Sequence, residues 1–172
     1  RHDLESYAFI DRPDPQFWAK GRRDAFKESV ELNCRPYREF GETRRRWWSS
    51  RLPAFLSSLP RPAGVFCSND VVAAEVISAA SRLGIAVPGD IAVVGVDDVE
   101  VYCESLTPTL TSVRPFFAAE GRAAADLLVA KLRNPRLKGV VKTLEAREIT
   151  RRQSTRCVTA KGGNIDLALE LI

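Results

Sequence analysis

The stretch AGVFCSNDVVAAEVISAASRLGIAVPGDIAVVGV, residues 63–96, decides the fold class of this chain. It contains two short apolar runs, residues 63–67 and 91–96, whose length and composition predict buried strands. Between them, Ser68-Asn69-Asp70 supplies side-chain oxygens that can cap a helix N-terminus, and the residues that follow predict a helix over 71–83. A strand, a helix and a second buried strand make the βαβ unit from which parallel sheets are built.

The same alternation continues on both sides of this unit. Further strands are expected at residues 7–10, 36–40 and 109–113, and a last extended segment at 140–149. Further helices are expected at 16–33, 43–59 and 115–133, with Pro53 dividing the second of them into two pieces. We therefore predict an α/β fold in which helices flank a parallel sheet.

Length and composition place the chain among ordinary globular proteins. Its 172 residues are 45% hydrophobic and 28% charged, with a formal net charge of +4, which allows a nucleic-acid partner without requiring one. No apolar run approaches the ~20 residues that a membrane helix needs. Because the chain opens at Arg1 and contains no Met, we expect it to be a fragment of a longer protein.

The sequence offers little for catalysis or for metal binding. His2 is its one histidine, and neither a G-x-x-x-x-G-K-[ST] nor a G-x-G-x-x-G phosphate loop occurs. The four cysteines stand apart, without a C-x-x-C pair, and we interpret them as reduced thiols of a cytoplasmic protein: Cys34, Cys67, Cys103 and Cys157. We therefore predict that the protein is no enzyme and that it holds no metal and no cofactor.

Polar residues follow three of the predicted strands. Asp11 follows the first strand, Ser68-Asn69-Asp70 follows the strand at 63–67, and Asp97-Asp98 follows the strand at 91–96. The carboxyl ends of parallel strands share one edge, where ligands bind in open α/β sheets. Carboxylates and amides at that edge suit a polyol, because each can pair with hydroxyl groups that both donate and accept. The alternative is that Asn69 and Asp70 only cap the following helix.

Two groups of basic and aromatic residues each allow a functional and a structural interpretation. Trp18 and Arg22 share one face of the first helix, where they offer a stacking plane and a guanidinium fork; the alternative is a solvated basic face. Arg44-Arg45-Arg46 and Trp47-Trp48 place charges beside rings, as single-strand nucleic-acid surfaces do. For this second group we favour the structural interpretation, in which the tryptophans pack on the sheet.

The segment from Pro62 to Val113 resembles the effector-binding domain of LacI/GalR-type transcription regulators. The resemblance rests on the order strand-SND-helix, then LGIAVPGDIAVVGVDD, then TPTLTSV, and it extends to EAREITRRQST at residues 145–155. The first helix, QFWAKGRRDAF at residues 16–26, is similar to the W-x-x-x-R-x-x-A-F version of AraC-type xylose operon regulators. The closing NIDLALELI at residues 164–172 favours the same branch, because a LacI-type chain usually stops soon after its RQST-like element.

The resemblance implies a two-lobed, periplasmic-binding-protein-like fold, of which this chain is expected to be mainly the second lobe. It divides the chain into an effector domain at 1–149, a linker at 150–164 and the start of a C-terminal, AraC-type helical domain at 165–172, with 109–133 crossing toward the missing first lobe. It further implies a cytoplasmic homodimer, a sugar effector that is D-xylose, DNA bound through a domain absent from this chain, and no membrane partner.

The resemblance also assigns ligand-binding residues. Arg22 would grip sugar hydroxyls, two carboxylates would accept hydrogen bonds, a tryptophan would stack on the sugar and two further residues would support them: Asp70, Asp97, Trp18, Asn69 and Asp98. Two other classes stay open at this point. One is a periplasmic sugar-binding protein of a transport system, and the other is a sugar-modifying enzyme with Asp70 and Asp97 as an acid–base pair.

Overall fold

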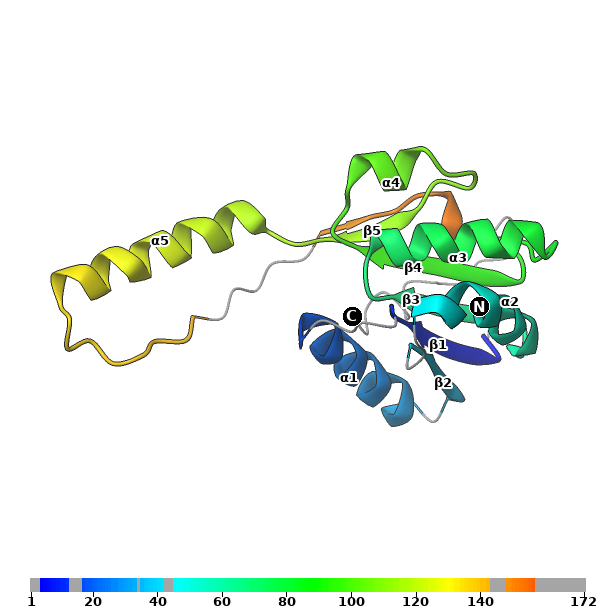
Figure 1. The fold of residues 1–172 in the computed structure, drawn as a ribbon, viewed down its shortest axis with the longest axis horizontal. Coiled ribbons are helices and arrows are strands. Elements are labelled where there is room, and N and C mark those ends of the chain that lie inside the picture. The colour runs from blue at the N-terminus through cyan, green and yellow to red at the C-terminus, as the bar shows by residue number, and fades with distance from the viewer. Residues whose placement is uncertain (1–3, 13–16, 34, 42–44, 143–147, 157–172) are drawn as a thin grey trace.

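The computed structural model describes residues 4–12, 17–33, 35–41, 45–142 and 148–156, along which strands and helices alternate (Figure 1). The strands are β1 (Ser6–Ile10), β2 (Tyr37–Phe40), β3 (Ala63–Cys67), β4 (Ile91–Val96), β5 (Thr111–Arg114) and β6 (Glu148–Thr150). The helices are α1 (Phe17–Leu32), α2 (Arg45–Ser58), α3 (Asp70–Arg82), α4 (Glu100–Glu104) and α5 (Phe117–Arg133), with a 3-10 turn η1 (Gln153–Thr155). The predicted helix at 165–172 lies outside the described residues.

The strands form one sheet in the order β2-β1-β3-β4-β5-β6. Neighbouring strands from β2 to β5 are parallel, and β6 runs antiparallel to β5. Strands β3 and β4 are buried along their whole length, as apolar central strands are when helices cover both faces of a sheet. The predicted α/β fold with a parallel sheet is thus confirmed, and the antiparallel edge strand β6 is the departure from it.

Helices on the two faces of the sheet bury two separate apolar layers. On one face, α2 and α3 contribute Leu52, Leu56 and Val76, each at most 2% exposed. On the other face, α1 packs Phe26 and Val30 against aromatic residues of β1 and β3. Because these strands are parallel, the polar residues that follow them lie together along the carboxyl edge of the sheet, between the two apolar faces.

Helix α2 contains Pro53 and is continuous, so the predicted division of residues 43–59 into two helices is wrong. A proline inside a helix costs about 3 kcal/mol. Full burial of a leucine side chain contributes about 1.5–3 kcal/mol, and Leu52 and Leu56 of α2 are both buried. The burial on one face of α2 therefore outweighs the cost of the proline.

Trp48 lies in the core between α2 and the sheet. Its side chain is buried, its ring lies 5.8 Å from that of Phe40, and its Nε1–H donates to the backbone carbonyl of Asp11 at 2.8 Å. The packing interpretation of the basic and aromatic run is thus confirmed for Trp48. The side chains of residues 44–47 lie outside the described part.

Residues 150–156 are packed on the sheet, which corrects the predicted linker over 150–164 in its described part. The Ser154 hydroxyl is buried, donates to the Val93 carbonyl at 2.6 Å and accepts from the Thr111 N–H at 2.9 Å. Polar residues that satisfy backbone groups leave no apolar pattern in the sequence, and this is why the segment was predicted to be a linker. The folded unit therefore extends at least to Thr155.

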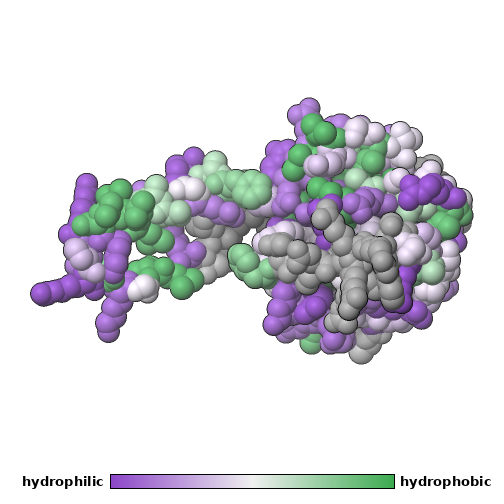
Figure 2. All heavy atoms as spheres, in the orientation of Figure 1, coloured by the Kyte–Doolittle hydropathy of each residue, from purple (hydrophilic) through white to green (hydrophobic). Residues whose placement is uncertain are grey.

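Helix α5 projects away from the sheet and its covering helices (Figure 1). Apolar side chains are visible on this projection in Figure 2. Phe117, Leu128 and Leu132 are 59%, 60% and 72% exposed, although an amphipathic helix ordinarily buries its apolar stripe. The exposed face of α5 is therefore suited to packing against another part of a protein.

Candidate functional site

The order of strands reverses between β1 and β3, at the centre of the sheet. The chain leaves β1 for β2 on one side and then crosses to β3 on the other side. Helix α1 lies on one face of the sheet and α3 lies on the opposite face. In open α/β sheets such a reversal opens a crevice at the carboxyl ends of the strands, and ligands bind there.

Arg22 reaches this edge from α1. Its Nη1 donates to the Ser68 carbonyl at 2.6 Å, just beyond the end of β3, and its Nη2 lies 3.4 Å from Asp97 Oδ1, just beyond the end of β4. The guanidinium carbon lies 4.6 Å from the centre of the Trp18 ring, a cation–π arrangement that follows from their positions one helical turn apart. The structure therefore brings Arg22, Trp18 and Asp97 together.

Asp97 is partly exposed at the edge, with 28% of its side chain accessible. Burial raises the pKa of Asp97, and the Arg22 guanidinium offsets part of that effect. The distance of 3.4 Å to Arg22 exceeds the ~2.7–2.9 Å of a strong charge-assisted hydrogen bond. A hydroxyl group could therefore enter between the two side chains without breaking a strong ion pair.

Asn69 caps helix α3. Its backbone is extended and its side-chain oxygen accepts from the Val72 N–H at 3.0 Å. This geometry is the capping alternative that the sequence left open, so the structural role of Asn69 is confirmed. The contact between Asn69 and a ligand stays a prediction.

Asp70 is turned toward the interior of the domain. It is 1% exposed, and its carboxylate accepts from the Ser112 hydroxyl at 2.5 Å, the Val99 N–H at 2.8 Å and the Cys103 thiol at 3.4 Å. Burial raises the pKa of Asp70, and these three donors partly counter the rise. The carboxylate thus joins α3, β5 and α4, and the structure does not bring it to Arg22.

Asp98 points away from its neighbour Asp97. Its side chain is wholly buried and accepts hydrogen bonds from Arg114, Thr150 and Arg152. The structure therefore separates five of the six predicted residues into two sets, and the sixth, Asn69, caps α3. Trp18, Arg22 and Asp97 meet at the accessible edge, whereas the carboxylates of Asp70 and Asp98 are held inside the domain.

Sequence reasoning missed the part that Ser68 plays at this edge. Its carbonyl anchors Arg22, and its buried hydroxyl has no hydrogen-bond partner among the described residues. The signal was its position directly after β3, beside the two residues that were assigned. Arg152 was also missed, because it lies in the segment that was predicted to be a linker.

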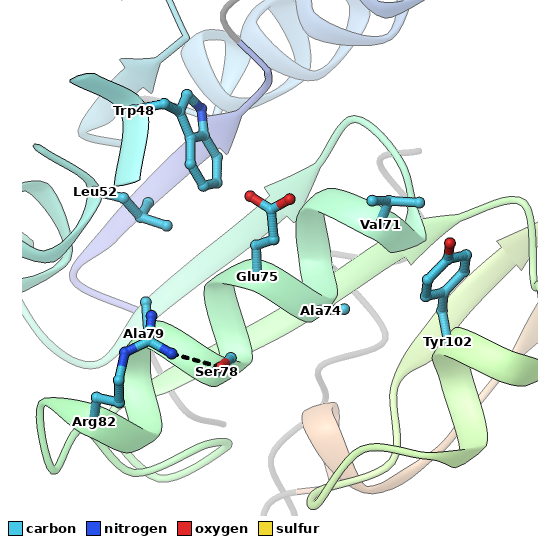
Figure 3. A pocket seen from close by; sticks show the side chains of 9 residues that line it. All are labelled: Trp48, Leu52, Val71, Ala74, Glu75, Ser78, Ala79, Arg82 and Tyr102. Atoms are coloured by element: carbon cyan, nitrogen blue, oxygen red, sulfur yellow. Dashed lines mark hydrogen bonds between the residues drawn. The ribbon is translucent and has the colours of Figure 1, made fainter. Parts of the chain in front are cut away.

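A separate hollow of about 470 Å³ lies between α2, α3 and α4 (Figure 3). Trp48 and Leu52 line it from one side and Tyr102 from the other, while Arg82 donates to Ser78 across its floor at 2.7 Å. None of the six predicted residues lines this hollow. The convergence of charged and polar groups therefore favours the carboxyl edge of the sheet as the ligand site.

Two further properties bear on function. Among the described residues, no group of histidine, cysteine and acidic side chains is arranged to hold a metal ion. Over the same residues, no helix combines the length and the apolarity needed to cross a membrane.

Comparison with known proteins places this chain in a family. A family model described as a periplasmic binding protein-like domain matches residues 5–155. The HTH-type transcriptional repressor PurR of Proteus mirabilis is 38% identical over 81 residues, which are 47% of this chain and 24% of that protein. The ribose operon repressor of Haemophilus influenzae is 30% identical over 84 residues, 49% of this chain and 25% of that protein. The chain thus spans about a quarter of the length of these curated relatives.

Solved structures agree with this placement. A LacI family transcriptional regulator from Arthrobacter sp. FB24 in complex with lactose superposes with a TM-score of 0.72 at 26% identity, covering 90% of this chain and 59% of that chain. The lac repressor dimer bound to operator also superposes with a TM-score of 0.72, at 23% identity over 90% of this chain and 54% of that one, a likeness of fold alone.

A doubly wound sheet with a polar carboxyl edge is typical of ligand-binding domains. The chain belongs to the family of periplasmic binding protein-like domains, as the match over residues 5–155 shows. The resemblance to LacI/GalR-type effector domains is supported by the repressor relatives. The similarity to AraC-type xylose regulators finds no support among the relatives named here.

Proposed function

We propose that this chain is the second-lobe part of the effector-binding domain of a sugar-responsive transcription regulator. The observation that carries the proposal is the meeting of Arg22, Asp97 and the Trp18 ring at the strand reversal of the sheet. A fork of N–H donors, an acceptor carboxylate and an aromatic plane match the three faces of a sugar: acceptor oxygens, donor hydroxyls and the apolar C–H side.

The six predicted residues take two kinds of role in this proposal. Arg22, Asp97 and Trp18 contact the sugar, because they lie together at the accessible edge. Asn69 and Asp70 hold the backbone at the ends of β3 and β4 through their hydrogen bonds to Val72 and Val99. Asp98 likewise supports the site from inside the domain.

The exposed apolar face of α5 supports a first lobe in the full-length protein. Residues 111–114 of the predicted crossing segment 109–133 form β5 of this sheet, so in this proposal the chain crosses after β5 through α5, and the first lobe covers Phe117, Leu128 and Leu132 and completes the sugar pocket. Sugar binding closes the two lobes and shifts the population between states that differ in DNA affinity. DNA is bound through another domain of a cytoplasmic homodimer, whose symmetry matches paired half-sites.

The finer proposal is that the sugar is D-xylose and that the DNA-binding domain is of AraC type. It rests on the similarity of the first helix to xylose regulators, since the relatives and structures named above concern PurR, ribose and lactose. A pentose lacks the exocyclic CH₂OH of a hexose, so a closely fitting pocket excludes hexoses sterically. Buried polar groups that the wrong sugar leaves unpaired add further discrimination.

A ligand panel on the full-length protein tests both levels of the proposal. The melting temperature is measured with D-xylose, D-ribose, glucose, galactose and hypoxanthine. We expect D-xylose to raise it most. A response to ribose or a hexose alone overturns the xylose assignment, stabilisation by hypoxanthine alone replaces the sugar with a purine, and the absence of any response contradicts the proposed function.

Two variants with a matched control locate the site. Asp97→Ala should weaken sugar binding by ~2 kcal/mol or more, the scale of a charge-assisted hydrogen bond left unmade, and Arg22→Ala should abolish the response. Arg23→Ala is the control, because Arg23 pairs with Asp24 at 2.9 Å on another part of the same helix. Calorimetric affinities that stay equal in all three variants, with the fold intact, would remove Arg22 and Asp97 from the site.

A further inference from the structure

One buried carboxylate holds both strands through which the sheet connects to α5. Asp98 accepts from Arg114 Nε at 2.7 Å, from the Thr150 hydroxyl at 2.7 Å and from Arg152 Nη1 at 2.8 Å. Arg114 is the last residue of β5, which leads into α5, and Thr150 is the last residue of β6, the first strand described after α5. The Asp98 carboxylate therefore links β5, which leads into α5, to β6, which follows it.

The charges around Asp98 keep this tie ionic. Burial alone would raise the pKa of Asp98, but the hydrogen bonds from Thr150, Arg152 and Arg114 outweigh it and lower the pKa below its ordinary value. The carboxylate is therefore ionised at neutral pH. Arg152 also pairs with Glu104 of α4 through its Nε, so the guanidinium is held between two carboxylates.

Asp98 is bonded directly to Asp97, whose side chain faces Arg22 at the opposite side. The two residues have φ angles of 109° and 50°, in the left-handed region that residues with a side chain seldom adopt. The Asp97 N–H donates to the Val113 carbonyl at 2.9 Å and the Asp98 N–H donates to Ser112 Oγ at 3.0 Å. Both N–H groups of this strained backbone are held by β5, so we expect a displacement of Asp97 to be passed on to Asp98.

We propose that Asp98 is a positioning residue that couples the effector contact at Asp97 to the geometry of β5 and β6. This inference rests on the proposed function, and it gives the bound effector a route from the sheet edge to the strands that carry α5. A ligand that shifts Asp97 shifts the joined backbone, and the ion pairs of Asp98 pass the shift to both strands. Asp98 does not itself contact the effector, because its side chain is wholly buried among the residues it holds.

Hydrogen exchange in the full-length protein tests this coupling. Amide exchange is measured in peptides that cover residues 111–114 and 148–152, without sugar and with D-xylose or D-ribose, and the melting temperature is measured in parallel. In the wild type we expect the sugar that raises the melting temperature to slow exchange in both peptides about tenfold, a change within the range of ordinary coupling between sites.

The decisive variant is Asp98→Asn, with Glu104→Gln as its control. Asparagine keeps the size of the side chain and removes its charge. At a sugar concentration that saturates the variant, as its own melting curves show, protection of both peptides should fall below about twofold. Glu104→Gln removes the other acidic partner of Arg152 from the half-exposed surface of α4 and should leave the protection unchanged. If Asp98→Asn does not fold, Thr150→Val removes one hydrogen bond to the same carboxylate and should reduce the protection.

The outcomes separate this inference from the proposed function. Equal protection in the wild type and in Asp98→Asn overturns the inference, as does equal protection in Thr150→Val if the first variant fails to fold. A wild type that binds sugar without protecting either peptide overturns the inference and leaves the proposed function standing. A wild type that no sugar stabilises overturns the proposed function and the inference with it.

Discussion

Replacing Asp70 by alanine should destabilise the domain more than any ordinary surface change. The carboxylate is 1% exposed and accepts strong hydrogen bonds from the Ser112 hydroxyl and the Val99 N–H. Each buried donor that loses its partner costs about 1–3 kcal/mol, and the vacated space adds to the loss. We therefore expect Asp70→Ala to lower the free energy of unfolding by about 3–5 kcal/mol, a large share of the ~5–15 kcal/mol of a typical domain.

Thermal and urea denaturation of the full-length protein measure this loss. For a domain of this size, about 2–4 °C per kcal/mol corresponds to a fall in melting temperature of about 6–20 °C. Glu28→Ala is the control, because Glu28 is exposed on α1 and its replacement should change the stability by no more than about 0.5 kcal/mol. A loss below about 1 kcal/mol in Asp70→Ala would mean that its hydrogen bonds are not formed in the protein.

The pH dependence of the same residue gives an independent check. Burial raises the pKa of Asp70 above its ordinary 3.8, so the folded state binds the proton more tightly than the unfolded chain does. The part of the stability that comes from this tighter proton binding is therefore complete below pH 3.8 and is lost as the pH rises through the folded pKa. Asp70→Asn cannot titrate, so the stability of the wild type minus that of this variant should decrease as the pH rises over this range. An increase would contradict the burial of an ionisable Asp70.

Two further changes test the packing around the site. Ser154→Ala should lower the free energy of unfolding, measured by urea denaturation, by about 2 kcal/mol, because it leaves the buried Val93 carbonyl and Thr111 N–H without their side-chain partner. An unchanged denaturation midpoint would contradict the packing of residues 150–156 on the sheet. Gly95→Ala should cost about 1–3 kcal/mol, because the added Cβ falls inside van der Waals contact with Asp70 Oδ1. In an Asp70→Ala background this second cost should shrink by at least about 0.5 kcal/mol, and strict additivity would contradict the close approach.

The central βαβ unit was predictable because its determinants are local. Short apolar runs predict the strands at 63–67 and 91–96, and the capping side chain of Asn69 predicts the start of α3. The meeting of Trp18 with Arg22 was predictable for the same reason, since residues one helical turn apart share a face. These features depend on the spacing of residues and not on the path of the rest of the chain.

The roles of the three carboxylates were not predictable at this level. Asp70, Asp97 and Asp98 all follow strands that end at the same edge, yet one faces Arg22 and two face the interior. Asp97 and Asp98 diverge on a backbone with positive φ angles, and Asp70 is turned inward at the start of α3, and no pattern of residue types reveals either feature. One signal was available, because Gly95 in a central strand indicates that another group approaches the backbone closely, and that group is Asp70.

The arrangement of Arg22 also bears on how a sugar would gain affinity at this edge. A long arginine side chain loses rotamer freedom when it is immobilised on binding, at a cost of about 0.5–1.5 kcal/mol. Here the hydrogen bond to the Ser68 carbonyl and the Trp18 ring already fix the guanidinium before any ligand arrives. The longer contact to Asp97 leaves the Nη2 side of the fork as the part that can turn to a hydroxyl group. The Arg22 guanidinium is thus ordered where it is anchored to the backbone and adaptable where a ligand would enter. This arrangement favours recognition through a few well-oriented hydrogen bonds over recognition through buried area.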